Sequence, residues 1–466
     1  MGQKKKTISV ISIILLSIGI GVLLRYLTLF YDPFCSKNFD CDPDWEEPEY
    51  YEDGIADSLV EECARYGADN LVFNQYCSGK FRYLYNAEDD EYDDSDYNIV
   101  RHAGTTYALL DLYEELEEEK YLTAGEAGLD YLCSFTHMIS WDKWAINWGG
   151  KMKVGTVSLA ILGMVRYWEA TENEKYNTYV ENFANFIVSQ QRDDGAFDGF
   201  YGKRGENRYY SGEAFFALAL AYDMLEDRSY RRAMEDALDY YWAEDYEYDD
   251  AAFIPWASSG CAKWYELTDN SKFRDFCFIM TDIQITRQNL QHELDVLGND
   301  LYGYFLGPTV NTGVYLEGVG DAYRVAKSIY DSNRIPKYHE SLKAGIEWVL
   351  TLQFRKKSQL ACPNRAYGGF HNGFTIKDAY DIRIDYNQHA ISAILRILRE
   401  FNDAEIETIQ INDGIVDFDP ECSDQQPNII KILPPLIGLV IIPLICIYLY
   451  MRKNFFSIDD TKVKNQ

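Results

Sequence analysis

Paired helical segments recur along most of this 466-residue chain. Between about residues 100 and 400, apolar residues recur at i, i+3, i+4 and i+7 in one segment after another, the spacing of one buried helix face. The alternation typical of strands is scarce. The pattern therefore predicts an all-α domain.

The segments form pairs of a first helix, a short polar turn and a second helix rich in Ala and Leu. Five pairs are complete: 107–113 with 121–132, 159–168 with 176–186, 215–222 with 230–240, 261–265 with 273–280, and 319–326 with 338–352. A sixth first helix over 388–401 has no second helix after it, but an amphipathic stretch over 55–66 is free to supply one. Six hairpins closed in this way predict an (α/α)6 toroid, with parallel inner helices and returning outer helices.

An open solenoid of helix pairs is the alternative arrangement. Solenoids of this kind keep a constant period of about 34 residues, whereas the spacing between successive pairs varies widely here. The loops before the first helices also carry unlike, chemically capable residues instead of a repeated pattern. Both observations favour the toroid.

Each end of the chain contains an uncharged apolar stretch. Residues 7–24 form 18 uncharged residues rich in Ile, Leu and Val, and residues 432–451 form a second stretch of 20. About 20 apolar residues cross the hydrocarbon core as a helix, so both stretches are predicted to span a membrane. A cleaved signal peptide is the alternative for the first. However, no A-x-A-like site follows it, and Arg25 stands where one is expected.

Positive charges flank both stretches on their outer sides, with Lys4 to Lys6 before the first and Arg452 and Lys453 after the second. The positive-inside rule then puts both termini in the cytoplasm and the domain between them outside. That domain contains no Asn-X-Ser/Thr sequon, which favours a prokaryotic envelope. The expected divisions are a basic tail and anchor (1–30), an acidic linker (31–54), the toroid (55–402), a linker (403–430), a transmembrane helix (431–451) and a cytoplasmic tail (452–466).

The charge distribution agrees with this division. The whole chain has 44 basic and 75 acidic residues, a net charge of −31, while residues 31–430 have 35 basic and 73 acidic ones, a net charge of −38. Binding to a nucleic-acid backbone requires a basic surface, so nucleic acid is not an expected partner.

The cysteines show no metal or redox motif. No C-x-x-C pair exists, which argues against a zinc ribbon. Cys35 and Cys41 are close enough in a polar segment to suggest a local disulfide bond. Nine cysteines are expected outside the membrane, and this odd number leaves at least one free thiol.

The acidic linker contains one calcium-like pattern. Asp40, Asp42 and Asp44 have the D-x-D-x-D spacing, but Trp45 replaces the turn glycine of such a loop and Tyr51 replaces its closing glutamate. A solvated linker is the better interpretation, and neither a metal nor a cofactor is expected.

Six short segments open the proposed inner helices: 101–105, 153–156, 209–213, 255–259, 315–318 and 383–389. In a toroid all six inner N-termini lie at one end and line a funnel. Gly, Ser and Thr in these segments allow close approach to the backbone, and helix N-termini favour negative charge. We expect a binding site at this end.

Three acids in these segments are candidate acid–base groups: Glu213, Glu317 and Asp385. Glu213 and Glu317 are predicted to face one another across the funnel, as the two carboxyl groups of a glycoside hydrolase do. Alternatively, they are ordinary acids in the first turn of a helix.

Two histidines are further catalytic candidates. His389 lies one turn after Asp385, which could orient it as a proton donor, and His102 lies beside Arg101. Either histidine could instead be a core residue with satisfied hydrogen bonds.

Glycine-rich aromatic loops over 144–150, 190–201 and 353–374 follow outer helices. Aromatic rings stack on apolar sugar faces, and Asp or Asn side chains bind hydroxyls. The alternative is that these loops only close the hairpin ends. The candidate substrate-binding residues in the loops and funnel are Arg101, Trp148, Asp194, Asp198, Arg208, Tyr210, Trp256 and Arg383.

The segment from Gln191 to Phe197 nearly matches Gln-x-x-Asp-Gly-x-Phe at the end of a helix pair. With Gly/aromatic loops repeated around a ring, it resembles the six-hairpin glycosidase superfamily of (α/α)6 toroids, over roughly residues 55–402. That superfamily includes glycoside hydrolases, polysaccharide lyases and sugar epimerases. The resemblance implies a site at the inner-helix N-termini and leaves the reaction open.

The expected function is that of a membrane-anchored, outward-facing carbohydrate-active enzyme, like a glycoside hydrolase or alternatively a lyase or epimerase. The acidic domain would repel polyuronates, which favours neutral or amino sugars unless Arg101, Arg208 and Arg383 form a basic floor. One alternative is a non-catalytic envelope receptor or scaffold. Another is a terpene cyclase, although the Asp-rich motifs of those toroids are absent from an inner helix here.

Overall fold

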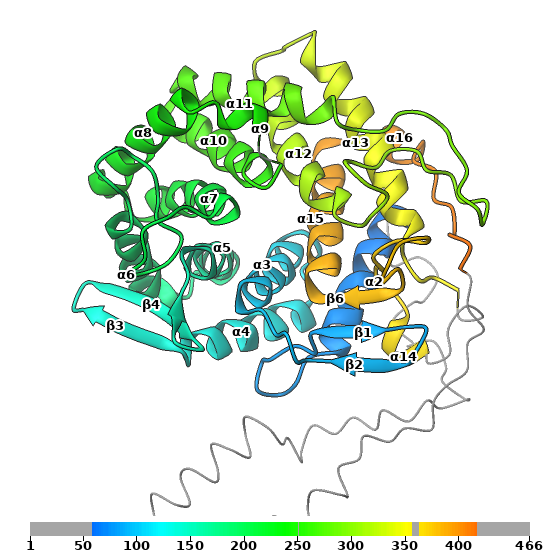
Figure 1. Ribbon diagram of the computed structural model, residues 1–466, viewed down its shortest axis with the longest axis horizontal. Coiled ribbons are helices and arrows are strands. Elements are labelled where there is room, and N and C mark those ends of the chain that lie inside the picture. Colours follow the sequence, from blue (N-terminus) through cyan, green and yellow to red (C-terminus); the bar gives the residue numbers. More distant parts are fainter. Residues whose placement is uncertain (1–57, 250, 357–362, 417–466) are drawn as a thin grey trace, which may run out of the picture.

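Helices in two concentric rings form the domain (Figure 1). The computed structural model describes residues 58–249, 251–356 and 363–416. Within them, six long helices form the inner ring: α3 (Ile99–Leu116), α5 (Val154–Thr171), α7 (Arg208–Leu225), α10 (Ile254–Thr268), α12 (Thr312–Ser328) and α15 (Ile384–Glu400). Each packs against the next, and α15 packs against α3, so the ring is closed.

The outer ring supplies one partner for each inner helix. Its members are α2 (Leu59–Phe73), α4 (Glu119–Cys133), α6 (Asn177–Ser189), α8 (Arg228–Ala243), α11 (Ser271–Ile285) and α13 (Arg334–Thr351). Helix α2, which comes first in the chain, packs against α15, which comes last. The predicted toroid, with its sixth pair closed by the N-terminal helix, is confirmed.

Acidic residues in the left-handed conformation end four of the inner helices. Glu117, Glu172, Glu226 and Asp269 have φ between 52° and 55° and each follows the last helical residue. In each case a single further residue precedes the outer helix or its leading 3-10 turn η1 (Glu174–Tyr176). These short turns keep inner and outer helices antiparallel and side by side.

A repeated glutamine ties neighbouring outer helices together. The Nε2 group of Gln191, after α6, donates to Gly195 O (2.9 Å) in its own loop and to Ala233 O (2.8 Å) in α8. Gln75, Gln288 and Gln353 each make the same pair of bonds after α2, α11 and α13. The loops that follow α2, α6, α11 and α13 therefore have a structural role in this fold.

The glycine of each such loop lies directly against the next outer helix. Gly195 has a φ of 99°, and a Cβ atom there would lie 2.3 Å from Asp236 O. Gly303 has a φ of 98°, and its Cβ would lie 1.9 Å from Ala344 O. Positive φ and the absence of space both require glycine at these two positions.

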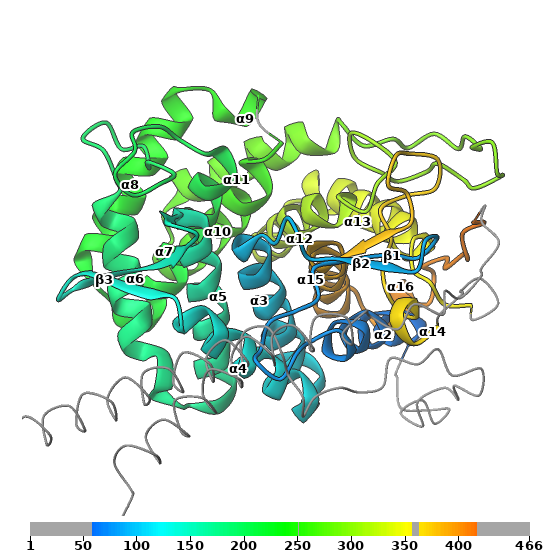
Figure 2. The ribbon, with the colours of Figure 1, turned by 60° about the horizontal axis from the view of Figure 1, so that its bottom comes forward.

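Two small antiparallel sheets interrupt the helical pattern, so the all-α prediction is incomplete. One contains β1 (Leu84–Asn86), β2 (Glu91–Asp93) and β6 (Asp381–Arg383), and the other contains β3 (Thr136–Ser140), β4 (Lys143–Trp148) and β5 (Lys151–Met152). Both lie at the edge of the ring (Figures 1 and 2). Strands of two to six residues are too short to produce a clear alternation in the sequence. Short helices α9 (Tyr246–Asp249), α14 (Pro363–Ala366) and α16 (Asp403–Ile406) complete the described elements.

The predicted membrane spans, 7–24 and 432–451, lie outside the described residues, as do Cys35, Cys41 and the calcium-like segment at 40–51. Among the residues that are described, no helix is sufficiently long and apolar to cross a bilayer. Cys77 is disulfide-bonded. The other described cysteines, Cys63, Cys133, Cys261 and Cys277, are free thiols.

Candidate active site

A cavity of about 300 Å³ lies at the N-terminal ends of the inner helices. Its size is at the lower end of the range for small-molecule sites. Every inner helix contributes to its wall. The lining residues are Asn98, Val100, Arg101, Leu159, Asn207, Tyr209, Tyr210, Glu213, Trp256, Asn311, Val314, Tyr315, Arg383, Asp385, Gln388 and His389.

Three asparagines that immediately precede inner helices line this cavity and are not among the residues predicted from the sequence. Asn98 accepts a hydrogen bond from Val100 N (3.1 Å) and Asn207 accepts one from Tyr210 N (3.3 Å), so both cap their helices. Asn311 precedes α12. An asparagine just before an apolar helical pattern is a helix-start signal, and in a toroid it also marks the wall of the funnel.

Glu213 is a buried carboxyl group in the second turn of α7, with only 4% of its surface exposed. Its Oε2 atom has no hydrogen-bond partner among the described residues. Burial raises the pKa of Glu213 to about 8, against a smaller opposing effect of the Lys153 ammonium. At neutral pH this carboxyl group is therefore mostly protonated and available as an acid.

Gly155 makes room for that carboxyl group. A Cβ atom at this position of α5 would lie 2.2 Å from Glu213 Oε2 and 2.3 Å from Tyr210 Cδ1. A side chain there would displace both groups. The glycine predicted to permit close approach therefore admits the glutamate of a neighbouring helix.

His389 and Glu317 form a hydrogen-bonded pair between α15 and α12. The distance from His389 Nδ1 to Glu317 Oε1 is 2.7 Å. Burial raises the pKa of Glu317 and the bond to His389 opposes this rise. Within the described residues His389 Nε2 has no hydrogen-bond partner, and the ring lines the cavity 6.1 Å from that of Trp256. A carboxylate at Nδ1 orients the imidazole and leaves Nε2 to exchange a proton.

Glu213 and His389 reach the cavity from opposite sides. The inner helices follow the ring order α3, α5, α7, α10, α12, α15, so α7 and α15 are three positions apart in a ring of six (Figure 1). A ligand in the cavity would lie between a protonated carboxyl group and an imidazole.

Asp385 is held by two arginines instead of facing His389. Arg383 donates to it through Nε (2.5 Å) and Nη2 (2.9 Å), and Arg101 Nε lies 3.0 Å from its Oδ2. Burial alone would raise the pKa of Asp385, but the hydrogen bonds and charge of Arg383, with that of Arg101, hold it below its usual value. The predicted Asp385–His389 pair is replaced by Glu317–His389, because Glu317 reaches Nδ1 from the adjacent helix.

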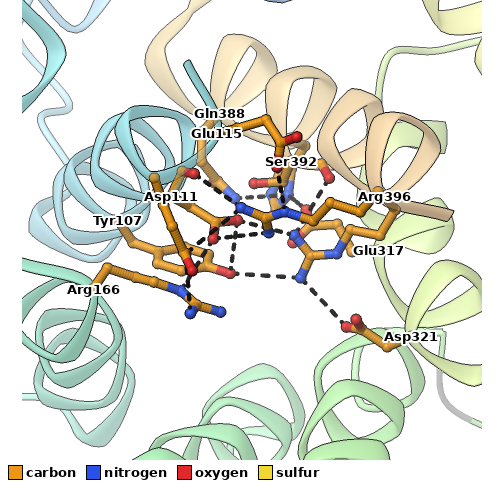
Figure 3. Close-up of polar contacts among 12 residues, drawn as sticks. Tyr107, Asp111, Glu115, Arg166, Glu317, Asp321, Gln388, Ser392 and Arg396 are labelled. Atoms are coloured by element: carbon orange, nitrogen blue, oxygen red, sulfur yellow. Dashed lines mark hydrogen bonds and ion pairs between the residues drawn. The ribbon is translucent and has the colours of Figure 1, made fainter. Parts of the chain in front are cut away.

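Glu317 itself does not line the cavity, so the predicted pair of facing glutamates is not what the structure shows. It lies near Arg396 and Asp321, beside a buried ionic cluster further along the inner helices (Figure 3). There the carboxylate of Asp111 contacts Arg166, Arg396 and Arg399 at 3.0, 3.3 and 3.1 Å. This cluster joins α3, α5 and α15.

His102 is a core residue. It is completely buried, its Nδ1 lies 2.7 Å from the Tyr97 hydroxyl and its Nε2 lies 3.1 Å from Gly128 O. Burial lowers its pKa to about 4, so the ring is neutral. It is absent from the cavity lining, because α3 turns this side chain outward toward α4.

Only some of the predicted substrate-binding residues line the cavity. Arg101, Tyr210, Trp256 and Arg383 line the cavity, while Trp148, Asp194, Asp198 and Arg208 do not. Trp148 packs on Phe135 and Tyr97, with ring centroids at 4.7 and 5.7 Å. Asp194 and Asp198 accept backbone hydrogen bonds within the 190–205 loop. Arg208 lies over the ring of Tyr246, 5.2 Å from its centroid.

No group of three His, Cys, Asp or Glu residues able to hold a metal ion occurs within the described ranges. The chemistry available in the cavity is that of Glu213, the His389–Glu317 pair and the two arginines around Asp385.

Comparisons with solved structures show that the fold is shared by enzymes acting on sugars. An α-1,6-mannanase of Salegentibacter has a TM-score of 0.53 and 11% identity, covering 73% of this chain and 100% of that one. It was solved as an inactive variant, with two consecutive aspartates changed to asparagine, in complex with α-1,6-mannotriose.

Two sugar-converting enzymes have the same architecture. A D-mannose isomerase has a TM-score of 0.53 and 10% identity, covering 75% of this chain and 100% of that one. A cellobiose 2-epimerase from Bacillus thermoamylovorans has a TM-score of 0.53 and 10% identity, covering 73% and 99%. No protein-family model matches the sequence, and no curated protein matches it significantly. The chain has the (α/α)6 toroid fold of the six-hairpin glycosidase-like enzymes, as the loop resemblance predicted.

Proposed function

We propose that this chain is a carbohydrate-active enzyme in which Glu213 acts as general acid and His389, oriented by Glu317, acts as general base. One observation carries the proposal. A buried carboxyl group with an unpartnered oxygen and an imidazole with an unpartnered Nε2, within the described residues, line the same cavity from opposite inner helices. An acid and a base on opposite sides of a bound molecule can protonate one face while removing a proton from the other.

The fold neighbours support sugars as the substrate class, because they include a mannanase, a mannose isomerase and a cellobiose epimerase. The lining also suits a hydroxylated ligand. It combines asparagine and glutamine side chains with the rings of Tyr210, Tyr315 and Trp256.

Proton transfer at carbon, as in epimerisation or isomerisation, fits the site better than glycoside hydrolysis. Hydrolysis with two carboxyl groups needs a second free carboxylate. Asp385 is the one aspartate in the described lining, and Arg383 and Arg101 occupy its oxygens. The lining contains no consecutive aspartates of the kind changed in the inactive mannanase variant. In the proposed reaction, His389 Nε2 removes a proton from the carbon beside the carbonyl of an opened sugar, and Glu213 supplies one to the other face.

Incubation with sugars in D2O tests this reaction. Mannose, glucose, cellobiose and mannooligosaccharides would be followed by NMR. We expect deuterium at the carbon beside the carbonyl and a new epimer or isomer. His389→Asn should reduce that rate by 10²–10⁴-fold, the usual contribution of a general base.

His292→Asn is the matched control. His292 is 72% exposed and hydrogen-bonded to Asp300, away from the cavity lining. Its variant should retain the wild-type rate. Release of new reducing ends without carbon-bound deuterium would instead identify a hydrolase.

A membrane-anchored, outward-facing domain remains part of the proposal. The apolar stretches at 7–24 and 432–451, the basic residues beside them and the disulfide bond at Cys77 support it, since disulfides persist outside the cytoplasm. Cysteines introduced as Ser36→Cys and Ser457→Cys would be tested with a membrane-impermeant maleimide in intact cells. We expect labelling at position 36 and, before lysis, none at position 457. Labelling at both positions would contradict this topology.

The alternatives predicted from the sequence differ from the proposal in testable ways. A non-catalytic receptor would bind sugars in the same cavity without exchange of carbon-bound hydrogen in any substrate. A terpene cyclase requires a large apolar cavity, whereas charged and amide side chains supply half of the lining of this one.

A further inference from the structure

Three basic side chains surround the active-site cavity of a strongly acidic domain. Arg101 and Arg383 line it, and Lys153 lies at the start of α5 with its Nζ 3.4 Å from Asn98 Oδ1, a lining residue. Two carboxyl groups accompany them, Asp385 and Glu213. Of these two, only Asp385 is paired with a basic side chain.

The guanidinium groups retain donors that Asp385 does not use. Arg383 contacts Asp385 through Nε and Nη2, and Arg101 contacts Asp385 through Nε and Tyr83 through Nη1. Within the described residues, Nη1 of Arg383 and Nη2 of Arg101 have no hydrogen-bond partner. One carboxylate thus holds two guanidiniums in place, and a positive charge and N–H donors remain beside the cavity.

Lys153 adds to this positive region. Its pKa is lowered by burial and also by the neighbouring Lys151 and Arg101 charges, while Glu213 opposes the change. The Lys153 ammonium, Arg101 and Glu213 are therefore close neighbours. Because Glu213 is buried with an unpartnered oxygen, it offers a hydrogen-bond donor when protonated instead of a second negative charge.

We infer that the substrate of this site carries a carboxylate, as a uronic acid does, and that the carboxylate binds at Arg101, Arg383 and Lys153. The inference rests on the proposed function only in taking the ligand to be a sugar. A neutral sugar would leave the spare guanidinium donors and their charge unpaired in a partly buried site, at a cost that a carboxylate removes.

The negative charge of the domain does not contradict this inference. Residues 31–430 have a net charge of −38, but exposed charges more than about 8–10 Å away are largely screened at physiological salt. The local groups decide which ligand is retained, whereas the distant charges only slow the approach of an anion.

Calorimetric titration of the full chain with matched sugar pairs tests the inference. Glucuronate, galacturonate and mannuronate would be compared with glucose, galactose and mannose. At least one acid should bind roughly tenfold or more tightly than its parent hexose, the usual gain from a hydrogen bond to a charged group. Arg101→Met should remove that preference.

Two further variants separate binding from folding. Arg101→Lys keeps the charge and should retain part of the preference. Arg208→Met, which removes an exposed arginine outside the cavity lining, should retain all of it. Thermal unfolding of each variant would verify that it is folded. Equal or weaker binding of all three acids by the wild-type protein, or an unchanged preference in folded Arg101→Met, would overturn the inference.

These outcomes are independent of the deuterium experiment. Conversion of neutral sugars without any preference for acids would leave the proposed function intact and refute the inference. Tight binding of a uronate without exchange of carbon-bound hydrogen would support the inference and refute the proposed function.

Discussion

Glu213→Gln should reduce the catalytic rate by 10²–10⁴-fold, because an amide has the shape of the protonated carboxyl group but cannot donate its proton. Glu213 lies in the cavity wall opposite His389, and Gly155 leaves just enough space for its carboxyl group. The measurement is the rate of deuterium incorporation into the best sugar substrate. A rate within threefold of the wild type would show that Glu213 is not the acid.

The same variant should be more stable than the wild type at and above neutral pH. In the folded protein burial raises the pKa of Glu213 from 4.5 to about 8. The unfolded chain therefore loses this proton at lower pH than the folded one, and folding is penalised increasingly as the pH rises from 4.5 to about 8. At pH 7 the penalty amounts to at most about 3 kcal/mol. Urea unfolding at pH 5, 7 and 8 should show a gain for the variant that grows with pH.

The pH dependence of the catalytic rate should follow the protonation of Glu213. The wild-type rate should fall as the pH rises through about 8, where Glu213 loses its proton. Glu235→Gln is the control, because Glu235 forms an exposed pair with Arg231 on an outer helix. It should leave both the rate and the pH dependence unchanged and alter stability by less than about 0.5 kcal/mol.

Asp111→Asn should lower the free energy of unfolding by about 3–5 kcal/mol, because it removes the carboxylate shared by three arginines. Asp111 is completely buried, and Arg166 of α5 and Arg396 of α15 contact it (Figure 3), as does Arg399 of α15. The asparagine variant would leave excess positive charge in the core. It would also weaken the junction where the last inner helix meets the first. Chemical denaturation at pH 7 would measure the loss.

Glu115→Gln is the matched control for this cluster. Glu115 also accepts a hydrogen bond from Arg399 (2.9 Å), but its side chain is 31% exposed. Its loss should cost less than about 1 kcal/mol, because water can solvate the guanidinium. If both variants cost the same, the buried carboxylate does not hold the ring closed.

The pH dependence should also distinguish these variants. Burial would raise the pKa of Asp111, but the charges of Arg399, Arg166 and Arg396 outweigh burial and hold it well below 3.8. A carboxyl group with a lowered folded pKa contributes stability that is present above pH 3.8 and is lost as the pH falls through the folded pKa. The wild-type advantage over Asp111→Asn should therefore persist from pH 8 to about pH 4.

Local patterns predicted the toroid well because its helices obey local rules. Within the described residues, apolar spacing located the twelve long helices, and the repeat of pairs indicated the closing role of residues 55–66, observed as α2. The strands escaped detection because each is too short to show a clear alternation, and one of their pairings, β1 with β6, joins segments almost 300 residues apart.

The sequence predicted where the candidate site lies, but it predicted less well which residues line it. Residues at the inner-helix N-termini, such as Glu213, Arg101 and Arg383, lie where a toroid must place them, at one end of the ring. His102 also starts an inner helix, but its side chain points outward into an aromatic cluster with Phe81 and Tyr131. The direction of a side chain around a helix axis depends on the packing of that helix, which a single sequence does not state.

The sequence by itself determined the pairing of the long helices between about residues 55 and 402 and the end of the ring at which chemistry could occur. These follow from periodicity and from the parallel direction of alternating helices. Only the tertiary structure decided which groups meet. In it, Glu317 rather than Asp385 contacts His389, and two arginines bind Asp385. Glu213 is buried, and one of its oxygens has no hydrogen-bond partner among the described residues. The contacts of His389 with Glu317 and of Asp385 with Arg101 join helices that are distant in sequence, and burial and neighbouring charges there shift the protonation of these groups.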